Sequence, residues 1–349
     1  MTNVGNGISF DPPGFKIPRT YQYSVGFQHE LKNGILLEAS YAGNYQIYIN
    51  EGYNMNVWSL EDNFQGFADN SFLSRTLPNP FYNILPRSTS LGGSNTISAS
   101  NLMRPNPIFT DITNNLVQDG RYRSDALQLK VEKRVLGGGS SGVLTFGVAY
   151  TLAKAFEMNH RLNNWNTAET PIYELDNTDK THSLQVHGVW DLPVGQGRKF
   201  NLGKSKAGAA LNDWSFDWIL SYVNGNPVNW PNLQNNCGTW KTSDPNEDHW
   251  FNNDKSCYQP FTNYNLRTIP DRFPDIRAPQ KPQLNLALSK TFPFKEKYKF
   301  LLRWETFNVF NSAIRPGPDT DFNSATFGML PKNQINFPRV MQVAAKFYF

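Results

Sequence analysis

The most constraining feature of this sequence is an alternation of apolar and polar residues that recurs along the chain. Successive side chains of a β-strand point to opposite faces, so a period of two predicts a strand with one apolar face. The last ten residues, VMQVAAKFYF, show the pattern with an apolar residue at every odd position: Met341, Val343, Ala345, Phe347 and Phe349. Nine segments share it: 20–30, 34–46, 121–135, 142–155, 181–192, 213–224, 281–292, 297–310 and the terminal run.

The length of these segments favours strands that cross a membrane. They are about 10–15 residues long, whereas strands of globular proteins average about five or six and a tilted membrane strand needs about 9–11. Apolar residues make up only 39% of the chain, aromatic residues 14%, and the mean hydropathy is −0.53. No segment approaches the ~20 apolar residues of a membrane helix. A membrane β-barrel has such a composition because half of its strand residues face water, but a soluble sandwich or propeller has it too.

The connections between the nine segments alternate in length. They cover 31–33, 47–120, 136–141, 156–180, 193–212, 225–280, 293–296 and 311–338, and only 193–212 fits neither the short nor the long class. Outer-membrane barrels have short periplasmic turns and long external loops. The sequence therefore predicts an all-β, antiparallel transmembrane β-barrel segment with about nine long strands, long external loops and short periplasmic turns.

Two further features predict that residues 1–349 form only part of a barrel. Bacterial single-chain barrels have even strand numbers, and an open barrel would leave unpaired strand edges in lipid. The N-terminal sequence MTNVGNGISFDPPGF has no basic segment and no apolar core, so it is not a signal peptide. We therefore expect the C-terminal part of a larger barrel, without plug, signal peptide or TonB-contacting segment.

The alternation also assigns side chains to the two faces of the predicted sheet. The candidates for the lipid-facing side are Trp190, Trp218, Leu286 and Trp304. The candidates for the lumen are His187, Asp217, Arg303, Glu305 and Lys346. Arg303 and Glu305 are neighbours on one face, which favours a lumenal ion pair over a ligand contact.

Two cysteines, Cys237 and Cys257, lie in the predicted loop 225–280. A disulfide between them would close a loop of about 20 residues and stabilise it by roughly 3 kcal/mol. It would also imply an oxidising compartment. The alternative is two free thiols in one loop.

The sequence shows no pattern typical of an enzyme, a resident metal or a cofactor. The five histidines lack metal-ligand spacing, and His182 and His187 fall on opposite faces of one strand. The acidic run DPNEDHWFNND lacks the central glycine of a calcium loop. The net charge of +4 is spread along the chain, which gives no indication of nucleic-acid binding. We expect no catalytic residues, no cofactor and no metal site.

Several segments resemble the C-terminal barrel of TonB-dependent outer-membrane receptors of the Oar-like type, which carry a carboxypeptidase-regulatory-like domain. The matching segments are RYRSDALQLKVEKR (121–134), LTFGVAYTLAKAF (144–156), DKTHSLQVHGVWDLPVGQGRKF (179–200), LRWETFNVFN (302–311) and the region 327–349. Receptors of this kind have a plug and about 22 strands, so this chain corresponds to less than half of such a barrel. The resemblance implies that Phe347 and Phe349 belong to a terminal signal read by the barrel-assembly machinery.

The resemblance further implies a location in the outer membrane and the uptake of a large ligand. The barrel wall and the external loops 47–120 and 225–280 would be the contribution of this chain. Its expected partners are outer-membrane lipid, the barrel-assembly machinery, an unknown imported ligand, and the TonB complex only through regions that this sequence lacks. The alternatives are a soluble secreted β protein that binds carbohydrate and a truncated gene product without independent function.

Overall fold

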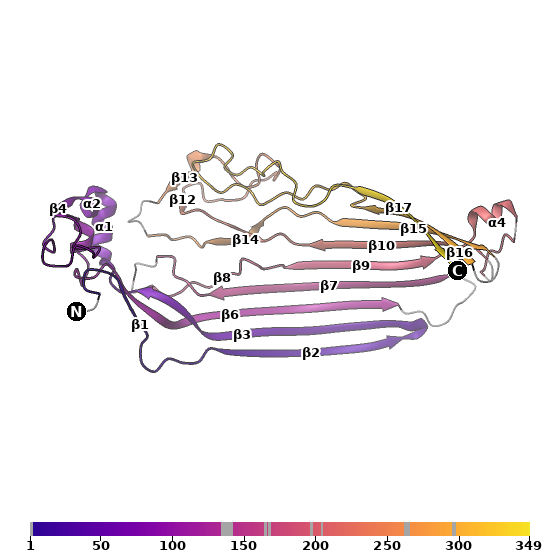
Figure 1. Cartoon of the computed structure of the whole chain (residues 1–349), viewed down its shortest axis with the longest axis horizontal. Helices are drawn as coiled ribbons and strands as arrows, with labels where there is room; N and C mark the ends of the chain where they lie inside the picture. Colours follow the sequence, from indigo (N-terminus) through magenta and orange to yellow (C-terminus); the bar gives the residue numbers. More distant parts are fainter. Residues whose placement is uncertain are drawn as a thin grey trace.

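The computed structural model describes residues 3–133, 142–163, 166, 169–195, 198–203, 205–261, 266–294 and 298–349. The main part of the molecule is one long antiparallel sheet, seen lengthwise in Figure 1, and three two-stranded sheets lie outside it. Nine strands lie in chain order, each hydrogen-bonded to its neighbours in sequence: β2 (Arg19–Leu31), β3 (Ile35–Asn54), β6 (Ile112–Lys133), β7 (Val143–Met158), β9 (His182–Asp191), β10 (Trp214–Val223), β15 (Gln283–Phe294), β16 (Tyr298–Phe307) and β17 (Val340–Tyr348). Each of the nine alternating segments is therefore confirmed as a strand.

Two strands are longer than the alternation predicted. β3 continues eight residues beyond position 46 and β6 begins nine residues before position 121, so parts of the predicted loop 47–120 are strand. The pairing of these extensions shifts register between Ile47 and Ile49, between Ile49 and Glu51, and between Glu51 and Tyr53. Each shift changes which face a side chain points to, so the extensions lose the period of two that identifies strands in sequence.

The connections divide the sheet into a short-turn end and a long-loop end. β2 and β3 are joined by the single turn η1 (Lys32–Gly34), where Asn33 has a left-handed φ of 66°. At the same end, β15 and β16 remain paired up to Phe294 and Tyr298. The 192–213 connection carries α4 (Lys206–Leu211), which lies beyond the same end (Figure 1). The connections between β3 and β6, β7 and β9, β10 and β15, and β16 and β17 all lie at the opposite end, as the alternating lengths predicted.

The long connections contain structure of their own. The β3–β6 connection forms a separate lobe beyond the sheet (Figure 1) with α1 (Leu60–Ala68), α2 (Ser71–Ser74), β4 (Thr76–Pro78), β5 (Thr96–Ser98) and α3 (Ala99–Leu102). The Ser59 hydroxyl caps α1 by accepting from the backbone N–H of Asp62. The remaining elements are β1 (Ile8–Phe10), β8 (Glu174–Leu175), β11 (Pro227–Asn229), β12 (Leu233–Asn235), η2 (Lys255–Cys257), β13 (Tyr258–Pro260) and β14 (Arg272–Arg277).

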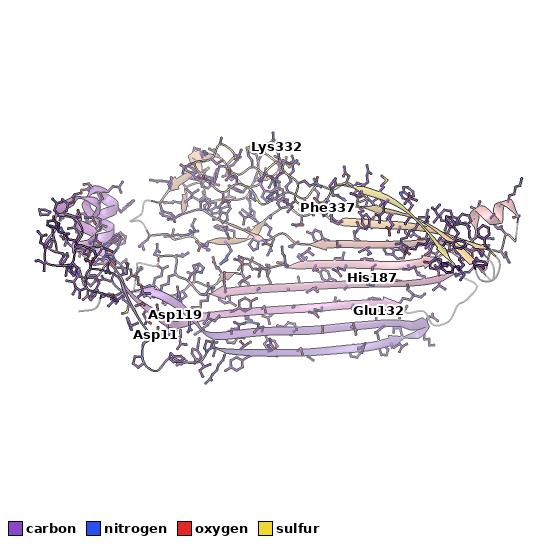
Figure 2. The ribbon with its side chains drawn as sticks, viewed as in Figure 1. Asp11, Asp119, Glu132, His187, Lys332 and Phe337 are labelled. Carbon is purple, nitrogen blue, oxygen red and sulfur yellow. A yellow bond between two sulfur atoms is a disulfide. The ribbon has the colours of Figure 1, made fainter. Side chains whose placement is uncertain are left out.

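The strand register separates an apolar face from a polar face across all nine strands. One row across the sheet reads Val148, Val186, Leu220 and Leu284. The next row on this face pairs Trp218 with Leu286, and the one after it reads Trp190, Phe216, Leu288, Trp304 and Val343. All four residues predicted to face lipid lie on this apolar face. All five predicted lumenal residues lie on the opposite, polar face. Glu132 and His187, both on the polar face, lie in the half of the sheet nearer the short turns, whereas Asp119 lies near the long-loop end (Figure 2).

The sheet has two unpaired edges within the described residues. β2 and β17 are its first and last strands, and each pairs with one neighbour only. Both strands run toward the short-turn end, because an odd number of antiparallel strands gives its first and last members the same direction. None of the described helices is long and apolar enough to cross a membrane.

Candidate functional site

Three long connections pack together at one end of the sheet into what we call the loop assembly, residues 159–181, 224–282 and 308–339. Its core is aromatic: Trp230 is 3% exposed, Phe251 is fully buried, and their ring centroids lie 4.6 Å apart. Phe327, from the last long connection, packs edge-on against Phe251 at 5.2 Å. The core also contains Val228, Leu233, Cys257, Tyr258 and Ile276. The loop assembly is therefore a folded unit rather than a set of independent loops.

A disulfide joins Cys237 to the buried Cys257 within this core. It closes 20 residues of chain and leaves no free cysteine. We expect reduction to lower the stability of the loop assembly by about 3 kcal/mol, because the open chain gains entropy. The test is the urea concentration at which trypsin cleaves within 224–282, with and without reductant. The double variant Cys237→Ser, Cys257→Ser should match the reduced protein, and an unchanged urea concentration would contradict the prediction.

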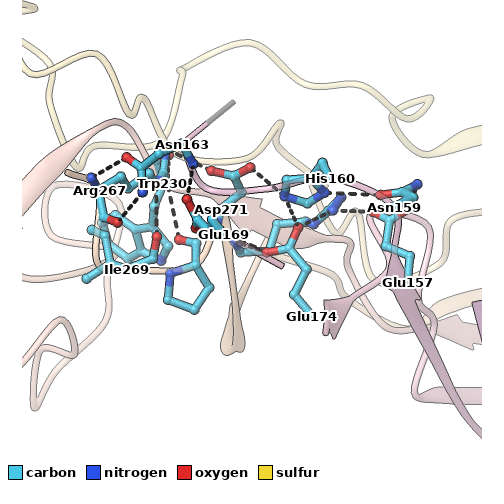
Figure 3. A network of polar contacts seen from close by, with 12 residues as sticks. Glu157, Asn159, His160, Asn163, Glu169, Glu174, Trp230, Arg267, Ile269 and Asp271 are labelled. Carbon is cyan, nitrogen blue, oxygen red and sulfur yellow. Dashed lines mark hydrogen bonds and ion pairs between the residues drawn. The ribbon is translucent and has the colours of Figure 1, made fainter. Parts of the chain in front are cut away.

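A buried ion-pair network connects the loop assembly to the C-terminal end of β7 (Figure 3). The Arg272 guanidinium contacts the carboxylates of both Glu157 and Glu174. Arg272 is 8% exposed and Glu174 is 5% exposed. The Glu174 carboxylate also accepts from the backbone N–H groups of Asp271 and Arg272, at 3.0 and 3.3 Å. Strand β7, strand β8 and the start of β14 are thereby held at one point.

His160 extends this network. Its Nε2 atom lies 2.9 Å from Asp271 Oδ2 and 3.2 Å from Glu174 Oε1. Three ligand atoms of these residues lie within 4.8 Å of one another, a spacing that a metal ion could use. However, Arg267 Nη1 lies 2.7 Å from Asp271 Oδ1 and Arg272 contacts Glu174, so both carboxylates already carry a cationic partner. This charge balance favours a structural ion-pair network over a metal centre.

The ion-pair network shifts the pKa values of His160, Asp271 and Glu174. Its contact with Asp271 raises the pKa of His160 above the usual 6.5, against the opposing effect of burial, and the same contact lowers the pKa of Asp271. Burial raises the pKa of Glu174 despite Arg272. A raised histidine pKa contributes stability that is complete below about pH 6.5 and is lost as the pH rises through the folded-state value.

We therefore expect the loop assembly to lose roughly 1–2 kcal/mol of stability as the pH rises above about 6.5. The measurement is the tryptic cleavage rate within 224–282, compared at each pH with that of His160→Gln. The ratio of variant to wild-type rates should fall toward one as the pH rises. A ratio independent of pH would show that His160 does not titrate in this range.

Two other arginines connect the loops to the strands. Arg161 pairs with Glu51 of β3 at 2.8 Å and with Asp119 of β6. Arg277 pairs with the buried Asp179 and donates to the Gly225 carbonyl at 3.0 Å. The partners joined by these two arginines are 42 to 110 residues apart in sequence. The position of the loop assembly over the end of the sheet is therefore fixed by several independent contacts.

Two neighbouring cavities of about 440 Å³ each lie at the base of the loop assembly. Both are bounded by Ala278 and Gln280. The first is also lined by Trp250 and by Lys241 and Asp275, which form an ion pair at 2.7 Å. Small-molecule sites have volumes of about 300–1,000 Å³ with a few polar groups among apolar walls. The volumes of the two cavities fall within that range, and the exposed Lys241–Asp275 ion pair borders the first.

On the polar face of the sheet, four of the five predicted lumenal residues lie close together. Arg303 contacts Asp217, and its Nε donates to Glu305 at 2.7 Å. His187, Asp217 and Arg303 line one cavity of about 470 Å³. Lys346 is on the same face but nearer the short turns, opposite Leu301 in the register. His187, Asp217, Arg303 and Glu305 therefore form one polar cluster, and Lys346 lies nearer the short turns.

The chain terminus lies at the short-turn end (Figure 1). Phe347 is on the apolar face, with its ring 6.0 Å from that of Tyr298. β17 ends at Tyr348, so Phe349 falls just outside the paired strand and is 95% exposed.

Sequence reasoning missed the network of His160, Glu174, Asp271 and Arg272. Its members come from different connections and have no fixed spacing, so no local motif marks them. The one available signal was the number of charged residues near the ends of predicted strands, which does not show which of them meet.

Comparison with known proteins supports the architecture. The family model of an outer membrane beta barrel domain matches residues 2–342. Among solved structures, the outer membrane transporter YddB from Escherichia coli aligns at 8% identity with a TM-score of 0.43, over 99% of this chain and 35% of that chain. This chain thus spans about a third of the length of YddB, and the likeness is too weak to carry an argument. A search of curated proteins finds no match.

Proposed function

Because the chain belongs to the family of outer membrane β-barrel domains, and is thus a protein of the outer membrane, we propose that it forms part of the wall of a transport barrel and supplies external ligand-contacting loops. This location excludes the alternative of a soluble secreted β protein. Since outer-membrane barrels keep their long loops outside, the loop assembly would face the medium and the short turns the periplasm.

The observation that carries the proposal is the division of the nine-stranded sheet into an apolar and a polar face. The apolar face would contact lipid, through residues such as Trp190, Trp218, Leu286 and Trp304. The polar face would line the lumen, with His187, Asp217, Arg303, Glu305 and Lys346 on it. A soluble sandwich buries its apolar face against a second sheet, whereas exposed apolar side chains are frequent here, for example Trp304 at 50% and Val343 at 69%.

The open edges of β2 and β17 support a larger barrel. Unpaired backbone groups are not tolerated in lipid, so further strands would close the barrel. β2 and β17 run in the same direction, so an all-antiparallel closure needs an odd number of additional strands whose first and last members run outward. A second copy of this chain in the same orientation would place β17 beside a parallel β2, so it does not meet this requirement.

The two cavities lined by the loop assembly support ligand capture at the external mouth. The resemblance to TonB-dependent receptors of the Oar-like type suggests energised uptake of a large ligand, with TonB reached through regions outside this sequence. In the same scheme, Phe347 and Phe349 would belong to the signal for the barrel-assembly machinery.

The proposal is tested with strains of the native organism that carry the wild-type chain, a variant or a control. The measurement is which compounds each strain removes from its medium. The variant is Lys241→Gln, Asp275→Asn, which removes both charges at the cavity while keeping the side-chain sizes similar. A matched control is Lys332→Gln, Asp321→Asn, at exposed loop positions outside the cavity. If the chain takes part in transport, the wild type and the control should deplete one compound from the medium. The variant should leave that compound in the medium, and a protonophore should prevent its depletion by the wild type. Identical depletion by all strains, with or without protonophore, would contradict ligand uptake.

A further inference from the structure

The apolar face carries a group of basic residues at its long-loop end, which we call the cationic belt: Arg19, Arg121, Arg123 and Lys154. The register puts all four on the same side of the sheet as Val25, Leu127 and Leu152. Arg19 and Arg121 lie in one row, two strands apart, and therefore about 10 Å from each other. Within the described parts of strands β2, β3, β6 and β7, the register puts one carboxylate, that of Asp125, among these four cations on this face.

The apolar band between the cationic belt and the short-turn end has the height of a membrane's apolar layer. On β6 the apolar residues Leu127, Leu129 and Val131 lie between Lys133 and the pair Asp125 and Arg123. Ten residues separate Lys133 from Arg123, which is roughly 33 Å along a strand and roughly 25 Å across the membrane at a tilt of about 40°. The apolar band of an outer-membrane barrel is also about 25 Å tall. If the apolar face contacts lipid, the belt lies at headgroup level on the external side.

Arg123 is held in a fixed arrangement. Its Nε donates to Asp125 Oδ2 at 2.7 Å. The hydroxyls of Tyr23 and Tyr41 donate to Asp125 Oδ1 at 2.7 and 2.6 Å, so three donors from three strands converge on this carboxylate. The Nε contact leaves the two terminal nitrogens of Arg123 without a partner among the described residues. Such a fork matches the oxygens of a phosphate group.

The other members of the belt are open to a ligand. Arg19 and Arg121 are exposed, and no described acidic side chain forms an ion pair with Arg19, Arg121 or Lys154. Phe156, opposite Arg123 in the register, stacks on Tyr173 with ring centroids 5.1 Å apart. Aromatic rings beside basic residues at the edge of an apolar face are typical of a membrane interface.

From this arrangement we propose that the cationic belt binds the phosphorylated headgroup of an outer-leaflet lipid. The acyl chains would lie along the apolar face below, against residues such as Val25 and Leu127, while Arg123 and its neighbours contact the phosphate. This inference rests on the proposed function, because it needs the apolar face to contact lipid. It adds a lipid-binding site on the outside of the barrel, separate from the ligand-contacting loops.

The test uses the protein extracted from its own outer membrane, with the triple variant Arg121→Gln, Arg123→Gln, Lys154→Gln. Asp125 stays in place with its two tyrosines. The matched control is Arg198→Gln, Lys199→Gln, Lys206→Gln, which removes the same charge at the short-turn end. Native mass spectrometry first counts the lipid molecules that each protein retains after washing. It then measures how well each protein rebinds four separate probes: lipopolysaccharide with its lipid phosphates, lipopolysaccharide without them, phosphatidylglycerol and inorganic phosphate.

The expected result is that the wild type and the control retain phosphorylated lipopolysaccharide, and that the belt variant binds it roughly a hundredfold more weakly. That factor follows from about fivefold for each basic residue near an anionic surface. Lipopolysaccharide without phosphates should bind poorly to all three proteins. Equal retention by the belt variant, equal binding without phosphates, or saturation by inorganic phosphate alone would overturn the proposal.

A spin label at Leu127→Cys separates this inference from its premise. If the label contacts lipid but the belt variant binds lipopolysaccharide normally, only the belt proposal fails. If the label is in water, the apolar face does not contact lipid, and the proposed function fails with it.

Discussion

Arg272→Met is expected to destabilise the loop assembly by about 3–5 kcal/mol. Arg272 is the shared partner of Glu157 and Glu174, and Glu174 is 5% exposed. Removing one member of a buried ion pair leaves the other charge uncompensated, which costs far more than an exposed pair contributes. The measurement is the urea concentration at which trypsin cleaves within 224–282, which should fall sharply while the barrel strands stay protected.

The control for this prediction is the double variant Arg272→Met, Glu174→Gln. The neutral amide at position 174 can still accept hydrogen bonds from the backbone N–H groups of residues 271 and 272. Because it carries no charge, it leaves no uncompensated anion at this position. It should therefore recover a large part of the lost stability. If Arg272→Met leaves protease resistance unchanged, or if the second substitution makes the protein less stable, the network does not hold the loops as described.

Leu286→Arg is the second large effect, with an expected cost of about 2–4 kcal/mol, because it would place a charge near the middle of the face that we propose contacts lipid. Leu286 lies on the apolar face between Trp218 of β10 and Thr306 of β16. The free energy of unfolding from lipid vesicles into urea measures the effect. The matched control is Ser221→Arg, on the polar face of the neighbouring strand, which should cost much less. Equal costs for the two variants would mean that the faces do not differ in environment.

The sheet was predictable from sequence because its determinant is local. An apolar residue at every second position, as from Leu284 to Leu288, follows directly from a strand with two different surroundings. The alternating connection lengths then give the two ends of the sheet. The prediction was wrong for residues 47–54 and 112–120, because the irregular pairing near Ile49 and Glu51 removes the alternation while the hydrogen-bonded strands continue.

The contents of the long connections were not predictable in the same way. The helix α1 has a local signal in Ser59, followed three residues later by Asp62, which is typical of a helix N-terminus. The network around Glu174 has none, because Arg272 lies 98 residues further along the chain. Such contacts depend on how the loops fold over the strand ends. The aromatic core around Phe251 and long-range ion pairs such as Arg277–Asp179 hold that arrangement, and no nearby sequence pattern marks them.

The central claim is that one face of this sheet contacts lipid and the other contacts water. It is tested most directly by spin labels placed singly along β10, from position 215 to position 222, in the outer-membrane protein with its disulfide intact. We predict that accessibility to oxygen peaks at positions 216, 218, 220 and 222, and that accessibility to a water-soluble nickel complex peaks at the positions between them. Water access at both sets of positions, or no alternation at all, would contradict the barrel-wall account.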